Sequence, residues 1–321
     1  MRVRIPPTIL RLGLRTLRPV FTSTRVSLAS KRRVIDLIAG ASRVPAGVVV
    51  EADSLAGVPV ERVMPPNKLP DGALLFLHGG GYASGSARGY RGFAGALASA
   101  SNIQVVVADY RLAPEHPFPA ALDDAVDVYR ALLQQVARVA VAGDSAGGGL
   151  TLALTQRIRD ESLAAPAALG LICPWLDLAV DKAAARSPAK DPLIIPSLTT
   201  EWCVFYAGSC EAGDPRISPI HGDLTSLPPI VMHSAGDDPL AADADKLERE
   251  IALRAPGSLL IHRKYTKRWH DFHLQVGFLA DADRAVELFG AQLAELVAGR
   301  HQPRQVAAAQ IDQIDSANGD L

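Results

Sequence analysis

The segment Gly143–Gly148, with the sequence GDSAGG, restricts the possible folds of this chain more than any other feature. An apolar run, VAVA, leads into it, and a longer apolar run, LTLALTQRI, follows soon after it. The first run is typical of a buried strand and the second of a helix, so the glycines must form a sharp turn between them. Such a turn fits the G-x-S-x-G pattern and holds the hydroxyl of Ser145 out from the end of a sheet. The helix that follows directs its free N–H groups toward the same place.

The rest of the chain alternates strand-like and helix-like segments. Short apolar runs bounded by turn residues predict strands, and stretches with helical periodicity separate them. This order predicts an α/β fold with a largely parallel sheet covered by helices on both faces, and it excludes the all-β fold of trypsin-like proteases. The predicted strands are residues 48–51 and 58–63, which form a hairpin, and 73–77, 103–108, 139–142, 169–173, 230–233 and 258–262; the predicted helices are 121–134, 150–159 and 283–298.

The composition excludes several classes of protein. The 321 residues contain 33 Lys and Arg against 34 Asp and Glu, a net charge of −1, whereas nucleic-acid-binding domains are strongly basic. Three cysteines, Cys173, Cys203 and Cys210, fit neither a disulfide framework nor a zinc site, and they favour a reducing compartment such as the cytoplasm. No apolar run reaches the roughly 18 residues that predict a transmembrane helix.

Residues 1–35 form a basic segment with nine Arg or Lys and no acid before Asp36. Its apolar and basic residues fall on different faces at helical spacing, and Pro19 predicts a break between two short helices. Two interpretations stay open: residues 1–33 bind the surface of an anionic membrane, or the helices pack on the body of the protein and expose their arginines to water. The apolar positions are Leu10, Leu14, Leu17 and Phe21, and the basic positions are Arg11, Arg15 and Arg18.

A second motif, His78-Gly79-Gly80-Gly81, directly follows the predicted strand at 73–77. A dinucleotide-binding loop would need G-x-G-x-x-G at the start of a helix, and the spacing after Gly81 does not fit it. Residues without side chains instead allow backbone N–H groups to approach the oxyanion of a tetrahedral intermediate. We therefore interpret the motif as an oxyanion loop, in which His78 has a structural role rather than that of a base.

A serine nucleophile needs a histidine base and an acid, and in a fold of this kind both follow late strands in the order Ser, acid, His. His270 lies in the loop after the last predicted strand and is the predicted base. His262 lies within that strand, and His273 lies about one helical turn further on. Asp237 and Asp238 both follow the preceding strand. Because adjacent residues point in opposite directions, one of the two faces the imidazole, and the pattern alone leaves the choice open.

Three motifs in this order resemble the hormone-sensitive-lipase group of esterases, whose microbial members carry the GDSAG version: HGGG at 78–81, DYRLAPE at 109–115 and GDSAGG at 143–148. The resemblance runs from about residue 45 to 300. It implies an α/β-hydrolase fold, hydrolysis of carboxylic esters and no cofactor, and we expect no metal. The implied organisation is cap helices in 1–44, a core in 45–177 and 213–300, a cap insertion in 178–212 and a loose tail in 301–321.

The resemblance also implies roles for single residues near the glycine motifs. The oxyanion donors of the group correspond to Gly79, Gly80 and Ala146. Asp109 and Arg111 match a structural motif, and we expect them to form an ion pair that braces the site rather than to act in catalysis.

For the acid and the base, the resemblance narrows the choice. The acid of the group lies in an Asp-Pro-Leu element, which begins at Asp238 in this chain and favours Asp238 over Asp237. The histidine of the group usually precedes Gly-Phe, whereas His270 precedes Asp271 and a phenylalanine. This departure leaves His270 as the expected base.

These assignments predict acyl transfer from an ester to water through an acyl-enzyme, with Ser145, His270 and Asp238 as the catalytic triad. The habit of the family favours short- to medium-chain acyl esters. Other hypotheses stay open: an amidase, a lipase or deacetylase that works at a membrane surface through the basic N-terminal segment, and a hydrolase fold that binds without catalysis.

Three aromatic residues are candidate walls of the substrate pocket, with ordinary core packing as the alternative. Tyr82 follows the oxyanion glycines, Trp175 follows a strand, and Tyr206 lies in the expected cap insertion. The expected partner is a small-molecule ester and not a nucleic acid. Peripheral membrane contact through residues 1–33 and a homodimer are further hypotheses.

Overall fold

The computed structural model describes residues 4–69, 71–179 and 190–300, so the expected tail at 301–321 and part of the expected cap insertion lie outside the described residues. Its centre is an eight-stranded sheet with the order β1-β2-β4-β3-β5-β6-β7-β8. The pairs β1–β2 and β2–β4 are antiparallel, and all other neighbours are parallel. The strands are β1 (Val49–Leu55), β2 (Val58–Met64), β3 (Gly72–Leu77), β4 (Gln104–Ala108), β5 (Arg138–Asp144), β6 (Leu169–Ile172), β7 (Ile230–Ala235) and β8 (Leu260–Tyr265).

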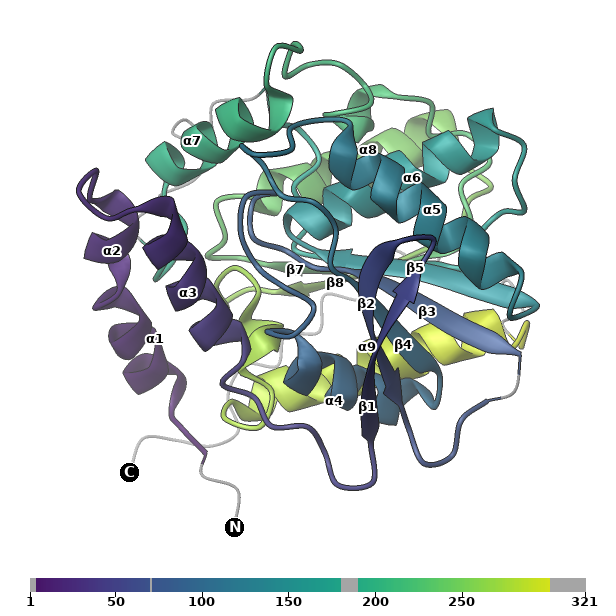
Figure 1. Ribbon diagram of the computed structural model, residues 1–321, viewed down its shortest axis with the longest axis horizontal. Coiled ribbons are helices and arrows are strands. Elements are labelled where there is room, and N and C mark those ends of the chain that lie inside the picture. The colour runs from purple at the N-terminus through teal and green to yellow at the C-terminus, as the bar shows by residue number, and fades with distance from the viewer. Residues whose placement is uncertain (1–3, 70, 180–189, 301–321) are drawn as a thin grey trace.

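Helices cover both faces of the sheet, as the alternating pattern predicts. In Figure 1, α5, α6 and α8 lie on one face, and α4 and α9 lie on the other. The helices are α1 (Pro7–Arg15), α2 (Arg18–Thr22), α3 (Leu28–Ala39), α4 (Arg91–Ser101), α5 (Ala120–Leu133), α6 (Ala146–Asp160), α7 (Pro196–Ala207), α8 (Ala241–Arg254) and α9 (Ala280–Val297), with short 3-10 turns η1 (Pro219–His221) and η2 (Phe272–Gln275).

The central strand β3 joins the cores on the two faces. Every residue of β3 is buried. Leu75 and Leu77 pack into the cluster that contains α5 and α6, whereas Leu74 and Phe76 pack into the cluster that contains α4 and α9. Burial of each such side chain contributes about 1.5–3 kcal/mol, so β3 is anchored from both sides. The HGGG motif at its carboxyl end therefore starts from a fixed position.

The predicted strands are confirmed with small shifts in their bounds. The first strand ends four residues later than expected, at Leu55. The last strand, expected at 258–262, spans Leu260–Tyr265 as β8. The amide of Ser258 donates to the carbonyl of Ala255 at 2.9 Å, so these residues still form a turn after α8. Helix α4 was not predicted, because the glycines in RGFAGALASAS lower its helix propensity, and its packing against α9 compensates for this.

The N-terminal helices α1, α2 and α3 lie together at one end of the molecule, and α7 lies next to α2 (Figure 1). The chain breaks between α1 and α2 at Thr16 and Leu17, so the expected pair of short helices is confirmed. Pro19 lies in the first turn of α2, where its missing N–H costs nothing, and a helix continuing from α1 would bring its ring against the carbonyl of Arg15.

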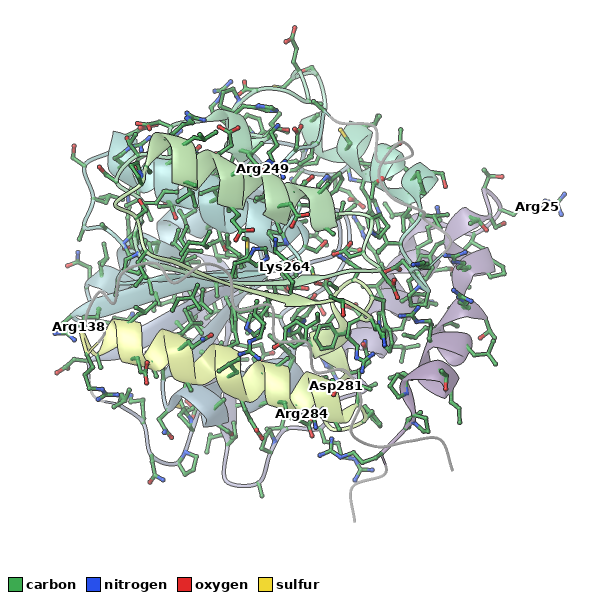
Figure 2. All side chains as sticks on the ribbon, turned by 180° about the vertical axis from the view of Figure 1, so that it is seen from behind. Arg25, Arg138, Arg249, Lys264, Asp281 and Arg284 are labelled. Carbon is green, nitrogen blue, oxygen red and sulfur yellow. The ribbon has the colours of Figure 1, made fainter. Side chains whose placement is uncertain are left out.

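Arginines of the N-terminal segment contact the body of the protein. Arg11 donates to the carboxylate of Asp237 at 2.7 Å, and Arg18 donates to the backbone carbonyl of Asp191. Arg25, in contrast, points away from the body (Figure 2). The interpretation that these helices pack on the body is confirmed, since Leu14 and Phe21 are buried. Its expectation that the arginines face water was wrong for Arg11 and Arg18, because charge-assisted hydrogen bonds to acceptors on the body replace their hydration.

Two further features concern membrane-spanning helices and the state of the cysteines. None of the helices in the described ranges is long and apolar enough to cross a membrane. Cys173 is a buried free thiol, and Cys203 and Cys210 are partly buried free thiols.

Candidate active site

Ser145 lies at the junction of β5 and α6, in a strained backbone conformation with φ 52° and ψ −120°. Such a conformation costs about 1–3 kcal/mol and persists only where its surroundings enforce it. Here the amide of Ser145 donates to the carbonyl of Ile172 at 2.9 Å, and its carbonyl accepts from the amide of Trp175 at 2.9 Å. A side chain at Gly147 would meet the carbonyl of Leu77 at 1.9 Å, so the turn is packed directly against the end of β3.

The structure brings Asp238, and not Asp237, to His270. The two strands that precede these residues, β7 and β8, are parallel neighbours, so their carboxyl ends meet at one edge of the sheet. Asp238 Oδ2 lies 2.9 Å from His270 Nδ1, and Asp238 Oδ1 accepts from the amide of Leu240 at 2.7 Å. Asp237 faces Arg11 instead.

The ring of His270 is buried and strongly polarised. Its Nε2 lies 2.9 Å from Oδ2 of Asp271. Burial alone lowers the pKa of His270, but the carboxylates of Asp238 and Asp271 outweigh it and raise the pKa well above its ordinary value. Within the described part of the chain, the hydroxyl of Ser145 makes no hydrogen bond to this ring, although both residues line the same pocket.

The oxyanion loop is tied to the site through Asp144. The amide of Gly79 donates to Asp144 Oδ1 at 2.8 Å. One of the three expected oxyanion donors is therefore already engaged in a hydrogen bond. Gly80 and Ser145 line the same pocket. Ala146 directly follows Ser145 and is the first residue of α6. The hydrogen bonds of the described residues include none from the amides of Gly80 and Ala146, which leaves these two free to bind an oxyanion.

His78 has a structural environment, in agreement with its interpretation from the sequence. It is fully buried, its ring stacks on Tyr110 with 4.3 Å between ring centroids, and its Nδ1 lies 2.8 Å from the carbonyl of Gly79. Burial lowers the pKa of His78, so its ring is neutral.

An apolar pocket opens at Ser145 and His270. Its walls come from helices far apart in the sequence, with α3 and α7 among them. The ring of Trp202 lies against the oxyanion loop, since a side chain at Gly81 would meet it at 2.2 Å. The lining residues are Phe21, Ile35, Ile38, Ala39, Gly80, Tyr90, Ser145, Leu193, Ile194, Leu198, Trp202, Trp269, His270, Asp271, Leu274 and Gln275.

The three aromatic residues predicted as pocket walls are core residues instead. Tyr82, Trp175 and Tyr206 are each at most 2% exposed, and none of them lines the pocket. Tyr82 stacks on Tyr206 with 3.6 Å between ring centroids, and both rings belong to the core cluster that contains α5 and α6. The wall prediction was therefore wrong, because ring-on-ring packing in the core takes precedence over exposure to the pocket.

Sequence reasoning missed Asp191, which links the expected cap insertion to the base. Its carboxylate accepts hydrogen bonds from the backbone amide of His270 at 2.8 Å and from those of Leu193 and Ile194 at 2.8 and 2.7 Å. Burial raises the pKa of Asp191 to about 6. No local pattern marks this role, because His270 lies 79 residues away in the chain.

The expected Asp109–Arg111 ion pair does not form. Arg111 pairs with Asp124 at 2.7 Å, and Asp109 accepts a hydrogen bond from the amide of Ala87 at 2.8 Å. Each of the two therefore finds its partner on a different part of the chain, Arg111 on α5 and Asp109 in the loop before α4.

The other candidate histidines have partners of their own. Nε2 of His262 lies 2.8 Å from the hydroxyl of Ser234, and Nδ1 lies 3.1 Å from Glu248. Nε2 of His273 lies 3.2 Å from Nδ1 of His233 in the core beneath β7. These contacts leave His270 as the histidine that lines the pocket with Ser145.

One cluster at the site combines atoms that metals bind. Cys173, His270 and Asp271 each offer an atom, and these atoms lie within 4.8 Å of one another. Both ring nitrogens of His270 are already engaged by carboxylates. Burial and the nearby carboxylates raise the pKa of the Cys173 thiol, which disfavours the thiolate that a metal needs. We therefore assign no metal to this cluster.

Comparisons with known proteins agree with this geometry. The model of a family described by its alpha/beta hydrolase fold matches residues 74–274. The chain is 48% identical over 302 residues to a protein of Mycobacterium tuberculosis provisionally named acetyl-hydrolase LipR, which covers 93% of this chain and 97% of that protein. It is 39% identical over 224 residues to an acetyl-hydrolase of Streptomyces hygroscopicus, with 68% and 74% of the two chains covered.

Solved structures are similar over nearly the whole chain. A crystal structure of an esterase/lipase from an uncultured bacterium has a TM-score of 0.83 and 32% identity, and covers 91% of this chain and 98% of its own. A crystal structure of a hormone-sensitive lipase from a metagenome library has a TM-score of 0.83 and 30% identity, with 92% and 99% covered.

Proposed function

We propose that this chain, which belongs to the α/β-hydrolase family and is a carboxylic ester hydrolase, cleaves short- to medium-chain acyl esters with Ser145 as its nucleophile. The observation that carries the proposal is the joint position of three residues. Ser145 lies on a strained strand-to-helix turn, and it lines one apolar pocket together with His270. Nδ1 of His270 contacts the carboxylate of Asp238. The Asp238–His270 contact is the acid–base relation of a Ser-His-Asp triad, and the shared pocket supports an approach of the Ser145 hydroxyl to Nε2 of His270 during the reaction.

In the proposed mechanism, Nε2 of His270 takes the proton of Ser145 as its Oγ attacks the ester carbonyl. Asp238 orients the ring through Nδ1 and stabilises the imidazolium that forms. The amides of Gly80 and Ala146 bind the oxyanion, and such a donor is worth about 3 kcal/mol. The imidazolium then protonates the leaving alkoxide, and a water molecule repeats the sequence on the acyl-enzyme. Gly79 joins the donors only where its amide leaves Asp144.

We propose that residues 1–44 and 178–212 form a cap that limits the acyl chain. Ile35 and Ile38 from α3 and Leu198 and Trp202 from α7 contribute to the pocket walls, which supports this assignment. The relatives named acetyl-hydrolases also support small acyl groups. We expect kcat/KM to be highest for acyl chains of about two to eight carbons, because each added methylene contributes ~0.8 kcal/mol only while it fits.

The test of the nucleophile compares Ser145→Ala with Ser99→Ala, which changes an exposed serine on α4. Wild-type protein and Ser99→Ala should hydrolyse a series of p-nitrophenyl acyl esters and react covalently with an organophosphate. Ser145→Ala should lose both properties while its circular dichroism spectrum stays unchanged. Covalent labelling of Ser145→Ala at the wild-type rate would contradict the assignment, and efficient hydrolysis of emulsified long-chain triglyceride by wild type would favour a lipase.

A further inference from the structure

His270 has a carboxylate on each side of its ring. Nδ1 lies 2.9 Å from Oδ2 of Asp238, and Nε2 lies 2.9 Å from Oδ2 of Asp271. A neutral imidazole carries one N–H, so it donates to one of these carboxylates, whereas the imidazolium donates to both. The arrangement therefore favours the protonated ring, which is the form that cannot take the proton of Ser145.

The backbone presents Asp271 to the ring. Asp271 has φ 49° and ψ 34°, a left-handed conformation that Asp and Asn tolerate and glycine adopts freely. Its side chain is 11% exposed, so water and salt screen its contact with Nε2 only weakly. The charge of this carboxylate therefore acts on the imidazole at nearly full strength.

A second buried carboxyl group lies behind Asp271. Two buried carboxylates in one site repel each other when both are charged. Burial and the charge of Asp271 raise the pKa of Asp144 well above its usual value, so we place a proton on Asp144. Asp144 also accepts from the hydroxyl of Tyr90 at 2.6 Å and from the amide of Gly79 at 2.8 Å. Asp271 is thereby left as the charged partner of the imidazole.

The other titratable groups around His270 do not cancel this effect. Asp191 accepts from its backbone amide, and burial raises the pKa of Asp191 to about 6, so it adds negative charge at neutral pH. Burial raises the pKa of the Cys173 thiol and lowers the pKa of His273 to about 3, so both are neutral. Burial also raises the pKa of Asp271, but the positive imidazole opposes that shift.

We propose that Asp271 is a fourth residue of the catalytic site, which binds Nε2 of the protonated imidazole and so sets the lower pH limit at which His270 acts as a base. The inference rests on the proposed function. It adds to the proposed triad a carboxylate that competes with Ser145 for the imidazole of His270. Asp238 orients the ring, whereas Asp271 competes with Ser145 for the nitrogen that must take the proton. Loss of the Nε2 proton removes the contact with Asp271 and frees this nitrogen for Ser145.

The first test is the pH dependence of kcat/KM for p-nitrophenyl acetate between about pH 5 and 10. Asp271→Asn keeps the shape of the side chain and removes its charge, and Asp271→Gly suits the left-handed backbone. The charge-matched control is Asp160→Asn, because the side chain of Asp160 is 68% exposed. We expect the acid limb to move down by about one pH unit or more in both Asp271 variants and to stay in place in the control.

The second test measures the imidazole pKa directly by NMR with labelled histidine, in Ser145→Ala with and without Asp271→Asn. This readout needs no turnover, so it separates the inference from the proposed esterase function. A downward shift in the imidazole pKa on loss of the Asp271 charge supports the inference. An unchanged pKa overturns it, even where activity falls, because the residue would then act only on structure. If Ser145→Ala stays active, the proposed function fails, and the titration still decides the role of Asp271.

Discussion

Replacement of Gly147 by alanine should damage both the fold and ester hydrolysis, because the turn after Ser145 has no room for a side chain. A Cβ at this position would lie 1.9 Å from the carbonyl oxygen of Leu77 and 2.7 Å from that of His78. Both atoms belong to the backbone, so no change of rotamer removes the contact. Real Cβ atoms stay at least 3.0 Å from such neighbours, so α6 and the end of β3 would have to separate by about 1 Å.

The size of both effects follows from that displacement. Overpacking of a close-packed site typically costs up to about 3 kcal/mol, and we expect Gly147→Ala to reach this value in the free energy of unfolding. A shift of about 1 Å also moves Ser145 relative to the oxyanion donors, which should lower kcat/KM about 100-fold. Both quantities are accessible, from urea unfolding followed by circular dichroism and from initial rates with a short-chain p-nitrophenyl ester.

The matched control is Gly13→Ala in α1. A Cβ at Gly13 would have no neighbour within 4 Å, so the substitution should raise the free energy of unfolding by about 0.5–1 kcal/mol through helix propensity alone. An unchanged urea midpoint and normal kcat/KM in Gly147→Ala would refute the reasoning, since they would mean that the β3–α6 contact is not tight.

Three further predictions concern the site. Asp238→Asn should lower kcat by about 10⁴-fold, as loss of the correct histidine tautomer does, whereas Asp237→Asn should lower it much less because Asp237 faces Arg11; the reverse ranking in steady-state kinetics would move the acid to Asp237. Wild-type kcat/KM should fall as the pH decreases through the raised pKa of His270, since only the neutral ring accepts a proton, so the midpoint of the acid limb should lie above about 6.5 and not at or below it. Trp202→Ala should widen the pocket and raise the ratio of kcat/KM for octanoate over acetate esters roughly tenfold, the effect of about two more buried methylenes; an unchanged ratio would show that Trp202 does not limit the acyl chain.

Features that depend on local sequence could be predicted well. The strand, turn and helix around Ser145 follow from the apolar runs and the glycines that allow close approach, and the structure has them in the expected places. The meeting of Asp238 and His270 follows from parallel strands, whose carboxyl ends share one edge of the sheet. Pattern alone did not choose between Asp237 and Asp238, because that choice depends on which side chain faces a distant arginine.

Features that depend on long-range packing could not be predicted. The faces of α1 were assigned from helical spacing, but spacing does not say that Arg11 meets an acceptor from a loop more than 200 residues away in the chain. The positions of Tyr82 and Tyr206 in the sequence suit pocket walls, but nothing in the sequence indicates that the two rings stack on each other. The contact between Asp271 and the imidazole depends on a left-handed backbone at one residue, which no local periodicity records.

The left-handed backbone at Asp271 has a consequence for how such an enzyme can diversify. Glycine, the residue that usually follows the histidine in the hormone-sensitive-lipase group, adopts the same φ of 49° without strain. Aspartate and glycine codons differ by a single base. A lineage can therefore exchange the two residues in one mutational step, with the path of the chain and the Ser-His-Asp residues unaltered, and so adapt the enzyme to a more acidic or a more alkaline habitat.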